Sequence, residues 1–443
     1  MARKMRDSGV EWIGEVPEGW EMKYLSQSVS QVKNRNDGLK EKNLLSLSYG
    51  KIKRKDIDSI GGLLPASFEG YNIIAPNDIV LRLTDLQNDQ HSLRVGLSHE
   101  SGIVTSAYTT IRPCDRINAV YLFYSLFAFD IAKGFYGMGS GVRQGLNYDE
   151  VKQIKLLSPP LPEQRRIADY LDEKCAAIDG AVDELKRGIE DCKAWKKAII
   201  FEAVTGKANV LAAKNAKVAK RQMRDSGIPW IGEIPEGWEI ARLKSLFSYG
   251  KGLAITKADL TPKGVPVISY GQIHAKANSG THLQDALLRH VSVDYLQTDG
   301  DCLLKKNDFV FADTSEDLEG LGNCAFVDRD DTIFAGYHTI VFRPKCDIPS
   351  KYLAYLFKTD CWRSQFRAKA YGIKVYSLSQ RLLNDCSVIL PPEREAGRIA
   401  NYLDEKCAAI DALVAEKEKL IADLEAYKKS LIFELVTGKR EVA

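Results

Sequence analysis

The sequence predicts an α+β protein in which two similar globular units are joined by two long helices. The first observation is a repeated segment, YLDEKCAAID, which occurs identically at Tyr170–Asp179 and at Tyr402–Asp411. Ten matching residues in a row indicate a pseudo-two-fold internal repeat. The second observation is that apolar residues around each copy recur in the a/d heptad pattern of a coiled coil.

A strict seven-residue register over many turns is typical of a helix that packs along another helix. At ~1.5 Å per residue, residues 163–201 would span on the order of 57 Å. Lys417, which replaces Leu185, is the one defect in the second copy. We expect the helices to pack on each other and to set the distance between the units; two unrelated amphipathic core helices are the alternative. The predicted helix–helix and partner interface consists of Leu171, Cys175, Ile178, Val182, Leu185, Ile189, Leu403, Cys407, Ile410, Val414, Ile421 and Leu424.

Length and composition favour a soluble protein of more than one domain. A chain of 443 residues is too long for one ordinary core, and 45% hydrophobic content is that of a globular protein. No apolar run approaches the ~18 residues of a membrane helix, and the first residues lead into no secretory signal. The nine cysteines are scattered, which predicts reduced thiols and a cytoplasmic location. Six histidines without ligand spacing predict no metal site, and a net charge of +3 neither requires nor excludes nucleic acid.

Two further repeated segments open and close each half. The opening segments are RDSGVEWIGEVPEGWE at Arg6–Glu21 and RDSGIPWIGEIPEGWE at Arg224–Glu239. The closing segments are FEAVTGK at Phe201–Lys207 and FELVTGK at Phe433–Lys439, in which glycine is expected to end the helix. The tryptophans of the opening segments are expected to anchor them, with ligand stacking as the alternative: Trp12, Trp20, Trp230 and Trp238.

These repeats predict six segments along the chain. They are an N-terminal repeated segment (1–21), a first variable domain (22–158), a central helix (159–206), a basic linker (207–223), the repeated opening segment with a second variable domain (224–390), and a C-terminal helix (391–443). Similar flanks around dissimilar middles indicate one scaffold with two different binding surfaces.

The two middles share a skeleton although their residues differ. In each, an Asn-Asp turn precedes a strand (77–81 and 307–311), and a polar loop follows it (82–90 and 312–319). A β-type run comes next (103–113 and 333–344), and its alignment places Tyr108 opposite Tyr337. A helix begins near Tyr121 and Tyr352, and a glycine-containing loop closes each region (134–145 and 370–377).

Motifs for chemistry are missing. The chain has no GxxxxGK[ST], GxSxG or HExxH, and its paired carboxylates fall mainly on polar helix faces. We therefore expect no catalysis by this chain.

The loops are instead suited to nucleic acid. The loops after the matched strands contain side chains that can hydrogen-bond to base edges, and the glycine loops place a basic residue on flexible backbone. A plain surface turn is the alternative for any one loop, and a core role is the alternative for the two tyrosines. The predicted DNA-contact residues are Arg82, Thr84, Asp85, Gln87, Asn88, Tyr108, Ser140, Arg143, Gln144, Asp313, Thr314, Ser315, Tyr337, His338, Lys374 and Tyr376.

Together the segments WIGEVPEGWE, RLTDLQND, LPEQRRIADYLDEKCAAID and FEAVTGK resemble the specificity subunit of type I restriction-modification enzymes, HsdS, over nearly the whole chain. The resemblance implies that the middles are target-recognition domains, each reading one half of a bipartite, asymmetric double-stranded DNA site. It implies that the helices pack antiparallel as a spacer and dock two modification subunits, which supply S-adenosylmethionine and methylate adenine. Restriction subunits would add ATP- and Mg-dependent translocation and cleavage. The second long helix begins with EREAGRI where the first begins with PEQRRI. This difference weakens the match in charge between the two halves.

Two other functions compete with this interpretation. A coiled-coil scaffold with two protein-binding end domains would show no salt-dependent DNA affinity, whereas phosphate contacts predict a steep fall with salt. A stand-alone enzyme is disfavoured by the missing motifs.

Overall fold

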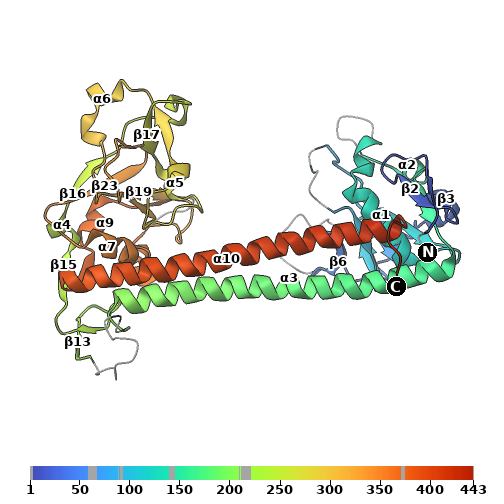
Figure 1. The fold of residues 1–443 in the computed structure, drawn as a ribbon, viewed down its shortest axis with the longest axis horizontal. Helices are drawn as coiled ribbons and strands as arrows, with labels where there is room; N and C mark the ends of the chain where they lie inside the picture. Colours follow the sequence, from blue (N-terminus) through green and yellow to red (C-terminus); the bar gives the residue numbers. More distant parts are fainter. Residues whose placement is uncertain are drawn as a thin grey trace. The chain divides into compact units, whose positions relative to one another are not determined.

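The computed structural model describes residues 3–57, 67–87, 89, 93–138, 145–208, 210, 221–370 and 375–442. The chain divides into two compact units, unit 1 (Met1–Lys186 with Lys417–Ala443) and unit 2 (Arg187–Glu416). Two helices of 44 residues, α3 (Leu161–Val204) and α10 (Glu393–Val436), each contribute one end to unit 1 and the other to unit 2 (Figure 1).

Unit 1 is built on a four-stranded antiparallel sheet of order β4-β11-β8-β9. Its strands are β4 (Val29–Gln31), β11 (Thr109–Pro113), β8 (Ile79–Leu81) and β9 (Val95–Leu97), and helix α1 (Ala119–Ile131) packs on it. Four strand pairs surround this sheet: β1 (Met5–Asp7) with β2 (Glu15–Pro17), β3 (Glu21–Tyr24) with β12 (Lys155–Ser158), β5 (Leu45–Ser48) with β6 (Lys51–Arg54), and β7 (Asn72–Ile74) with β10 (Gly102–Val104). Short helical turns are η1 (Leu25–Gln27), η2 (Gly134–Gly137) and α2 (Tyr148–Val151).

Unit 2 repeats this plan. Its sheet has the order β16-β23-β19-β21, from β16 (Phe247–Lys251), β23 (Thr339–Pro344), β19 (Phe309–Ala312) and β21 (Cys324–Phe326). The helices α7 (Ser350–Phe357) and α8 (Asp360–Arg367) follow the last strand. The remaining strands are β13 (Met223–Asp225) with β14 (Glu233–Pro235), β15 (Glu239–Arg242) with β25 (Ser387–Leu390), β18 (Arg289–Val291) with β17 (Val265–Ile268) and β22 (Phe334–Ala335), and β20 (Thr314–Ser315) with β24 (Tyr376–Ser377). Short turns are α4 (Leu243–Leu246), α5 (Tyr270–Ile273), α6 (Tyr295–Thr298), α9 (Gln380–Asn384), η3 (Lys257–Asp259), η4 (Asp285–Leu287) and η5 (Gly300–Cys302).

The opening segment of each unit packs on the C-terminal end of a long helix. In unit 1, α10 is followed by Gly438 at φ 71°, and a Cβ added there would lie 2.5 Å from Pro17. In unit 2, α3 is followed by Gly206 at φ 71°, and an added Cβ would lie 2.5 Å from Pro235. Glycine at these stops therefore provides both a left-handed conformation and room for the opening segment. Trp20 and Trp238 are buried beside them, as anchors should be.

The long helices run antiparallel within each unit. In unit 1, Leu171 and Cys175 of α3 pack in the core that holds Leu435 and Leu431 of α10, and Asp179 further along α3 pairs with Lys428, which lies earlier in α10. In unit 2, the C-terminal end of α3 shares a core with Ile399 and Leu403 of α10. Lys196, which lies earlier in α3, pairs with Asp411, which lies later in α10. The interhelical ion pair of each unit has an N–O distance of 2.6 Å. Most predicted seam residues are buried, and Leu185, Val414, Ile421 and Leu424 are half-buried. The predicted fold class is confirmed.

One alignment made from the sequence is wrong. Asp78 pairs with Arg112 at 2.7 Å, and Asp308 pairs with Arg343 at 2.8 Å, so these pairs fix the correspondence between the two sheets. In that register Tyr108 corresponds to Thr339, and not to Tyr337. Each predicted β-type run is in fact two strands with a turn between them, and in this register residues 102–113 align with residues 333–344 without an insertion.

Candidate nucleic-acid interface

In unit 1 the polar loop after β8 is organised by one buried arginine. Arg94 is fully buried and donates to the carbonyl oxygens of Arg82 at 3.0 Å and Thr84 at 2.9 Å, and also to those of Asp85 and Asp89. Its guanidinium lies over the Tyr136 ring, 5.1 Å from the centroid. A buried cation that donates to four carbonyls holds the loop in one conformation, because its loss would leave the Arg82 and Thr84 carbonyls without a donor.

An acid behind Arg94 completes the clamp. Asp130 of α1 accepts a 2.7 Å hydrogen bond from the Arg94 backbone N–H. Burial raises the pKa of Asp130 to about 6, although the Arg94 hydrogen bond and charge oppose that shift.

The clamped loop presents several of the predicted residues. Leu83 and Leu86 point into the core, whereas Thr84 and Gln87 are exposed, and Arg82 and Asp85 are half-buried. Asp85 has a φ of 58°, a left-handed conformation that Asp tolerates better than most residues. Asn88 lies outside the described residues. The loop therefore presents a hydroxyl and an amide on a fixed backbone, which are groups able to read base edges.

Tyr108 lies at the same end of the sheet. It precedes Thr109, which pairs with Leu81 at the end of β8, so it neighbours the start of the Arg82 loop. Tyr108 packs against the small core around Val80 and Val104, which agrees with the core role considered as the alternative for this residue. It also lines a cavity of about 470 Å³ together with Lys33 and other polar residues.

In unit 2 the structure brings the predicted residues together around β20. Asp313 donates its N–H to the carbonyl of His338 at 3.1 Å, and its carboxylate lies 3.2 Å from His338 Nδ1. Thr314 and Ser315 pair in β20 with Ser377 and Tyr376 in β24. His338 is exposed and Tyr376 is half-buried, so aromatic and polar groups are presented side by side.

Three residues of this cluster, Tyr270, His274 and Asn323, were not predicted from the sequence. The Tyr270 ring lies 5.6 Å from the rings of both Tyr337 and His338. His274 Nε2 lies 2.8 Å from the Thr314 carbonyl, and its Nδ1 lies 3.2 Å from the Asn323 amide. The segment VISYGQIH supplies the tyrosine and the histidine, and its residues ISYGQI match LSYGKI at residues 47–52 of the first half. This short repeat, which places Tyr270 opposite Tyr49, is the signal that could have identified the tyrosine.

The loop of unit 2 is also held by a buried arginine, but from another element. Arg363 of α8 donates to the Asn323 side chain at 2.8 Å and to the carbonyl of Phe357 at 2.8 Å, with a longer bond to the Glu319 carbonyl. Arg367 also donates to the Glu319 carbonyl, at 2.6 Å.

The described ends of the glycine loops meet these polar loops in both units. Leu146 N–H donates to the Leu83 carbonyl at 2.9 Å, and Leu378 N–H donates to the Asp313 carbonyl at 2.7 Å. The two predicted loop types therefore converge at one end of each sheet. The remaining predicted residues, Ser140, Arg143, Gln144 and Lys374, lie outside the described residues.

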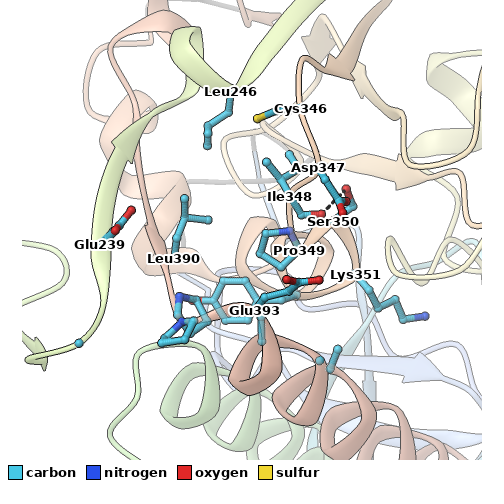
Figure 2. A pocket seen from close by; sticks show the side chains of 17 residues that line it. Glu239, Leu246, Cys346, Asp347, Ile348, Pro349, Ser350, Lys351, Leu390 and Glu393 are labelled. Atoms are coloured by element: carbon cyan, nitrogen blue, oxygen red, sulfur yellow. Dashed lines mark hydrogen bonds between the residues drawn. The ribbon is translucent and has the colours of Figure 1, made fainter.

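A groove of about 720 Å³ in unit 2 marks a difference between the halves (Figure 2). In unit 1, Gln164 accepts a hydrogen bond from Asn118 N–H at 2.9 Å. In unit 2, Pro349 replaces Asn118 and has no N–H, and Ala396 replaces Gln164. The smaller residue leaves apolar side chains lining an open groove, among them Leu246, Ile348, Pro349 and Leu390 (Figure 2). None of the predicted DNA-contact residues lines it.

The described part of the chain contains no group of three or more His, Cys, Asp or Glu side chains placed to hold a metal ion. Among the described helices, none is both long and apolar enough to cross a membrane.

Three kinds of comparison with known proteins agree. A family model described as the type I restriction modification DNA specificity domain matches residues 235–422. The type I restriction enzyme MjaVIII specificity subunit of Methanocaldococcus jannaschii is 23% identical, over 96% of this chain and 94% of that protein.

Two solved structures share the fold. One is a chain from a structure reported on the complex assembly and conformational transition of the type I R-M system. Its TM-score is 0.66 at 16% identity, and the match covers 95% of this chain and 98% of that one. The HsdS subunit from Thermoanaerobacter tengcongensis gives a TM-score of 0.51 at 14% identity, covering 98% and 100%. The family resemblance inferred from the repeated segments is confirmed.

Proposed function

We propose that this chain, which belongs to the specificity-subunit family of type I restriction-modification enzymes, directs such an enzyme to a bipartite DNA site. Each unit reads one half of an asymmetric double-stranded sequence with the loops at one end of its sheet. The antiparallel helices set the spacer between the halves. The chain contributes recognition and performs no reaction.

One observation supports this most strongly. The two units share the same sheet order and the same ion pair across the sheet, yet the loops at the same sheet end present different side chains. Arg82, Leu83 and Asp85 of unit 1 are replaced by Ala312, Asp313 and Ser315 in unit 2, although Thr84 has Thr314 as its counterpart. Equivalent positions with different hydrogen-bonding groups are what two readers of different half-sites require.

The partners follow from the family and from the helix surfaces. Two modification subunits dock on the helices and supply S-adenosylmethionine for adenine methylation, and restriction subunits use ATP and Mg to translocate and cleave DNA. Trp195 of α3 and Tyr427 of α10 occupy equivalent positions in the repeat and are 55% and 48% exposed. Exposed aromatic residues at equivalent sites suit two copies of one partner, because such residues dominate interface energetics.

Mapping of methylated adenine in cells that contain this chain and its partners tests the proposal. Removing one heptad from each helix, residues 182–188 and 414–420, keeps both interhelical ion pairs in register. We expect the methylated motif to keep its two half-sites and to lose spacer base pairs. An unchanged spacer would contradict the proposed role of the helices, and a motif that does not depend on this chain would contradict the proposal itself.

A further inference from the structure

The β5–β6 hairpin of unit 1 has an unusual tip. Its strands are joined by Tyr49 and Gly50, with φ values of 48° and 74°. Positive φ at both positions is what a type I′ turn requires, and Asn-Gly is the sequence best suited to it. Tyrosine is a poor residue for a left-handed conformation, and its side chain is 80% exposed. The ring therefore contributes little to folding, which suggests that it contacts something outside the chain.

The two faces of this hairpin differ sharply. One face packs on β9, because a Cβ added at Gly96 would lie 2.5 Å from Leu47 and 3.0 Å from Ile52. On the other face the strand register pairs Ser46 with Lys53 and Ser48 with Lys51. That face offers hydroxyl and ammonium groups, without a carboxylate in either strand.

An acid of α3 orients the hairpin. Lys51 pairs with Asp179 at 2.9 Å, and Asp179 also accepts from Lys428 at 2.6 Å. In unit 2 the equivalent Asp411 pairs with Lys196, and no described hairpin of that unit reaches it. Lys53 and Lys55 are exposed and form no ion pair with another described residue. Their charges are therefore available to a ligand.

We propose that the Ser46–Lys53 face and the Tyr49 tip of this hairpin bind the sugar-phosphate backbone of DNA next to the half-site read by unit 1. The proposal rests on the function proposed above, and it adds a contact that carries no sequence information. A two-stranded β-ribbon fits a DNA groove, and side chains on one face of a strand follow each other at ~7 Å. Serine, lysine and tyrosine are typical phosphate ligands. A face whose two strands carry hydroxyl and ammonium groups and no carboxylate of their own favours a polyanion over a protein surface.

Two variants of the full chain, assembled with its modification subunits, test the contact. Tyr49→Asn creates an Asn-Gly turn, so the hairpin should be at least as stable while the ring is lost. Lys53→Ala with Lys55→Ala removes two charges, and Lys257→Ala with Lys263→Ala, exposed lysines of unit 2, is the charge-matched control. The probe is a duplex containing the motif mapped by methylation, titrated at several salt concentrations.

We expect Tyr49→Asn to weaken binding by roughly 5- to 10-fold without lowering Tm. The double lysine variant should reduce the slope of log affinity against log salt by about 2, or about 1 for each lysine. The methylated motif should stay the same in both. Unchanged affinity and slope in both variants, with a steep slope in the parent complex, would overturn this proposal alone. Loss of subunit assembly with unchanged DNA affinity of the chain would overturn it in favour of a protein contact. A parent complex without salt-dependent DNA affinity would instead contradict the proposed function.

Discussion

Units 1 and 2 are attached to the long helices by matching hydrogen bonds. Tyr121 of α1 donates to the Val436 carbonyl at 3.3 Å, and Tyr352 of α7 donates to the Val204 carbonyl at 2.8 Å. One turn later along each helix, Tyr124 donates to Asp172 at 2.8 Å and Tyr355 donates to Asp404 at 2.6 Å.

The loop clamps are not equivalent. Arg94 follows the loop that it holds in unit 1, whereas Arg363 comes from a helix well beyond the loop that it holds in unit 2. The two units therefore share the hydrogen bonds that attach them to the long helices, but they hold their recognition loops with arginines from different elements. Substitutions in the framework should therefore have equal effects in both units, and substitutions in the clamps should not.

The largest effect is expected from Arg94→Met. The substitution leaves the Arg82 and Thr84 carbonyls without a donor and weakens the hydrogen bonding of the Asp85 and Asp89 carbonyls, which keep the Asp89 N–H and the Tyr136 hydroxyl. We expect it to destabilise the Arg82 loop by roughly 3–5 kcal/mol. Hydrogen exchange should then become fast at residues 82–87 and stay slow at residues 313–320. Arg363→Met is the matched control and should produce the opposite pattern. Equal exchange in the two loops in either variant would contradict the assignment of the clamps.

Lys358→Met is expected to have the next largest effect and to abolish a pH dependence of unit 2. Lys358 occupies the place of Phe127 in unit 1, and burial lowers its pKa to about 8. Because the folded pKa lies below the ordinary lysine value of 10.5, the folded state binds fewer protons between these pH values, and stability rises with pH across that window. Removing the ammonium should stabilise unit 2 by about 2 kcal/mol at pH 7 and have little effect above pH 10.5.

Denaturant unfolding at pH 7 and pH 9.5 measures this prediction. A Lys358→Met variant that keeps the full pH dependence of the parent would show that another group titrates.

Tyr124→Phe and Tyr355→Phe should have equal, smaller effects. Each removes one hydroxyl that donates to an aspartate, which contributes ~1–2 kcal/mol. The two losses of stability should agree within about 0.5 kcal/mol, because each variant removes the same kind of hydroxyl–carboxylate bond at an equivalent place. Unequal losses in urea unfolding would show that the two attachments are not energetically equivalent.

The smallest effect is expected from neutralising the interhelical acids. Partial burial raises the pKa of Asp179, but hydrogen bonds from Lys428 and Lys51 outweigh burial and hold this pKa below its ordinary value. The stabilisation is therefore present above the unfolded pKa and lost as pH falls through the folded pKa. Asp179→Asn should cost less than about 1 kcal/mol at pH 7, and Asp411→Asn less again because it has one lysine partner. Thermal unfolding at pH 7 and pH 3 measures this loss of stability. A difference in Tm between each variant and the parent that is the same at both pH values would contradict the prediction.

The sequence predicted the parts that are repeated. The helical seam, the glycine stops and the opening segments were found because two copies of each could be compared, and their roles are local consequences of heptad spacing and backbone conformation. The strand and helix of each middle were also found, since the Asn-Asp turns and the apolar runs recur.

What differs between the halves could not be predicted in the same way. Arg94 lies in a polar stretch that suggests a surface loop, and only the fold shows that its side chain turns inward. The β5–β6 hairpin lacks the Asn-Gly signal of a type I′ turn, and Tyr49-Gly50 adopts the turn all the same. The exchange of Gln164 for Ala396 makes sense only once Pro349 is seen to remove the N–H that Gln164 would bind.

The central claim is that each unit reads its own half of the site on a common framework. Replacing residues 22–158 with the corresponding region of a relative changes the variable domain of unit 1 and leaves α3, α10 and unit 2 unaltered, and both cut points fall at the paired strands β3 and β12. Mapping of methylated adenine should then show one altered half-site, with the other half-site and the spacer length unchanged. A change in both half-sites would contradict the account.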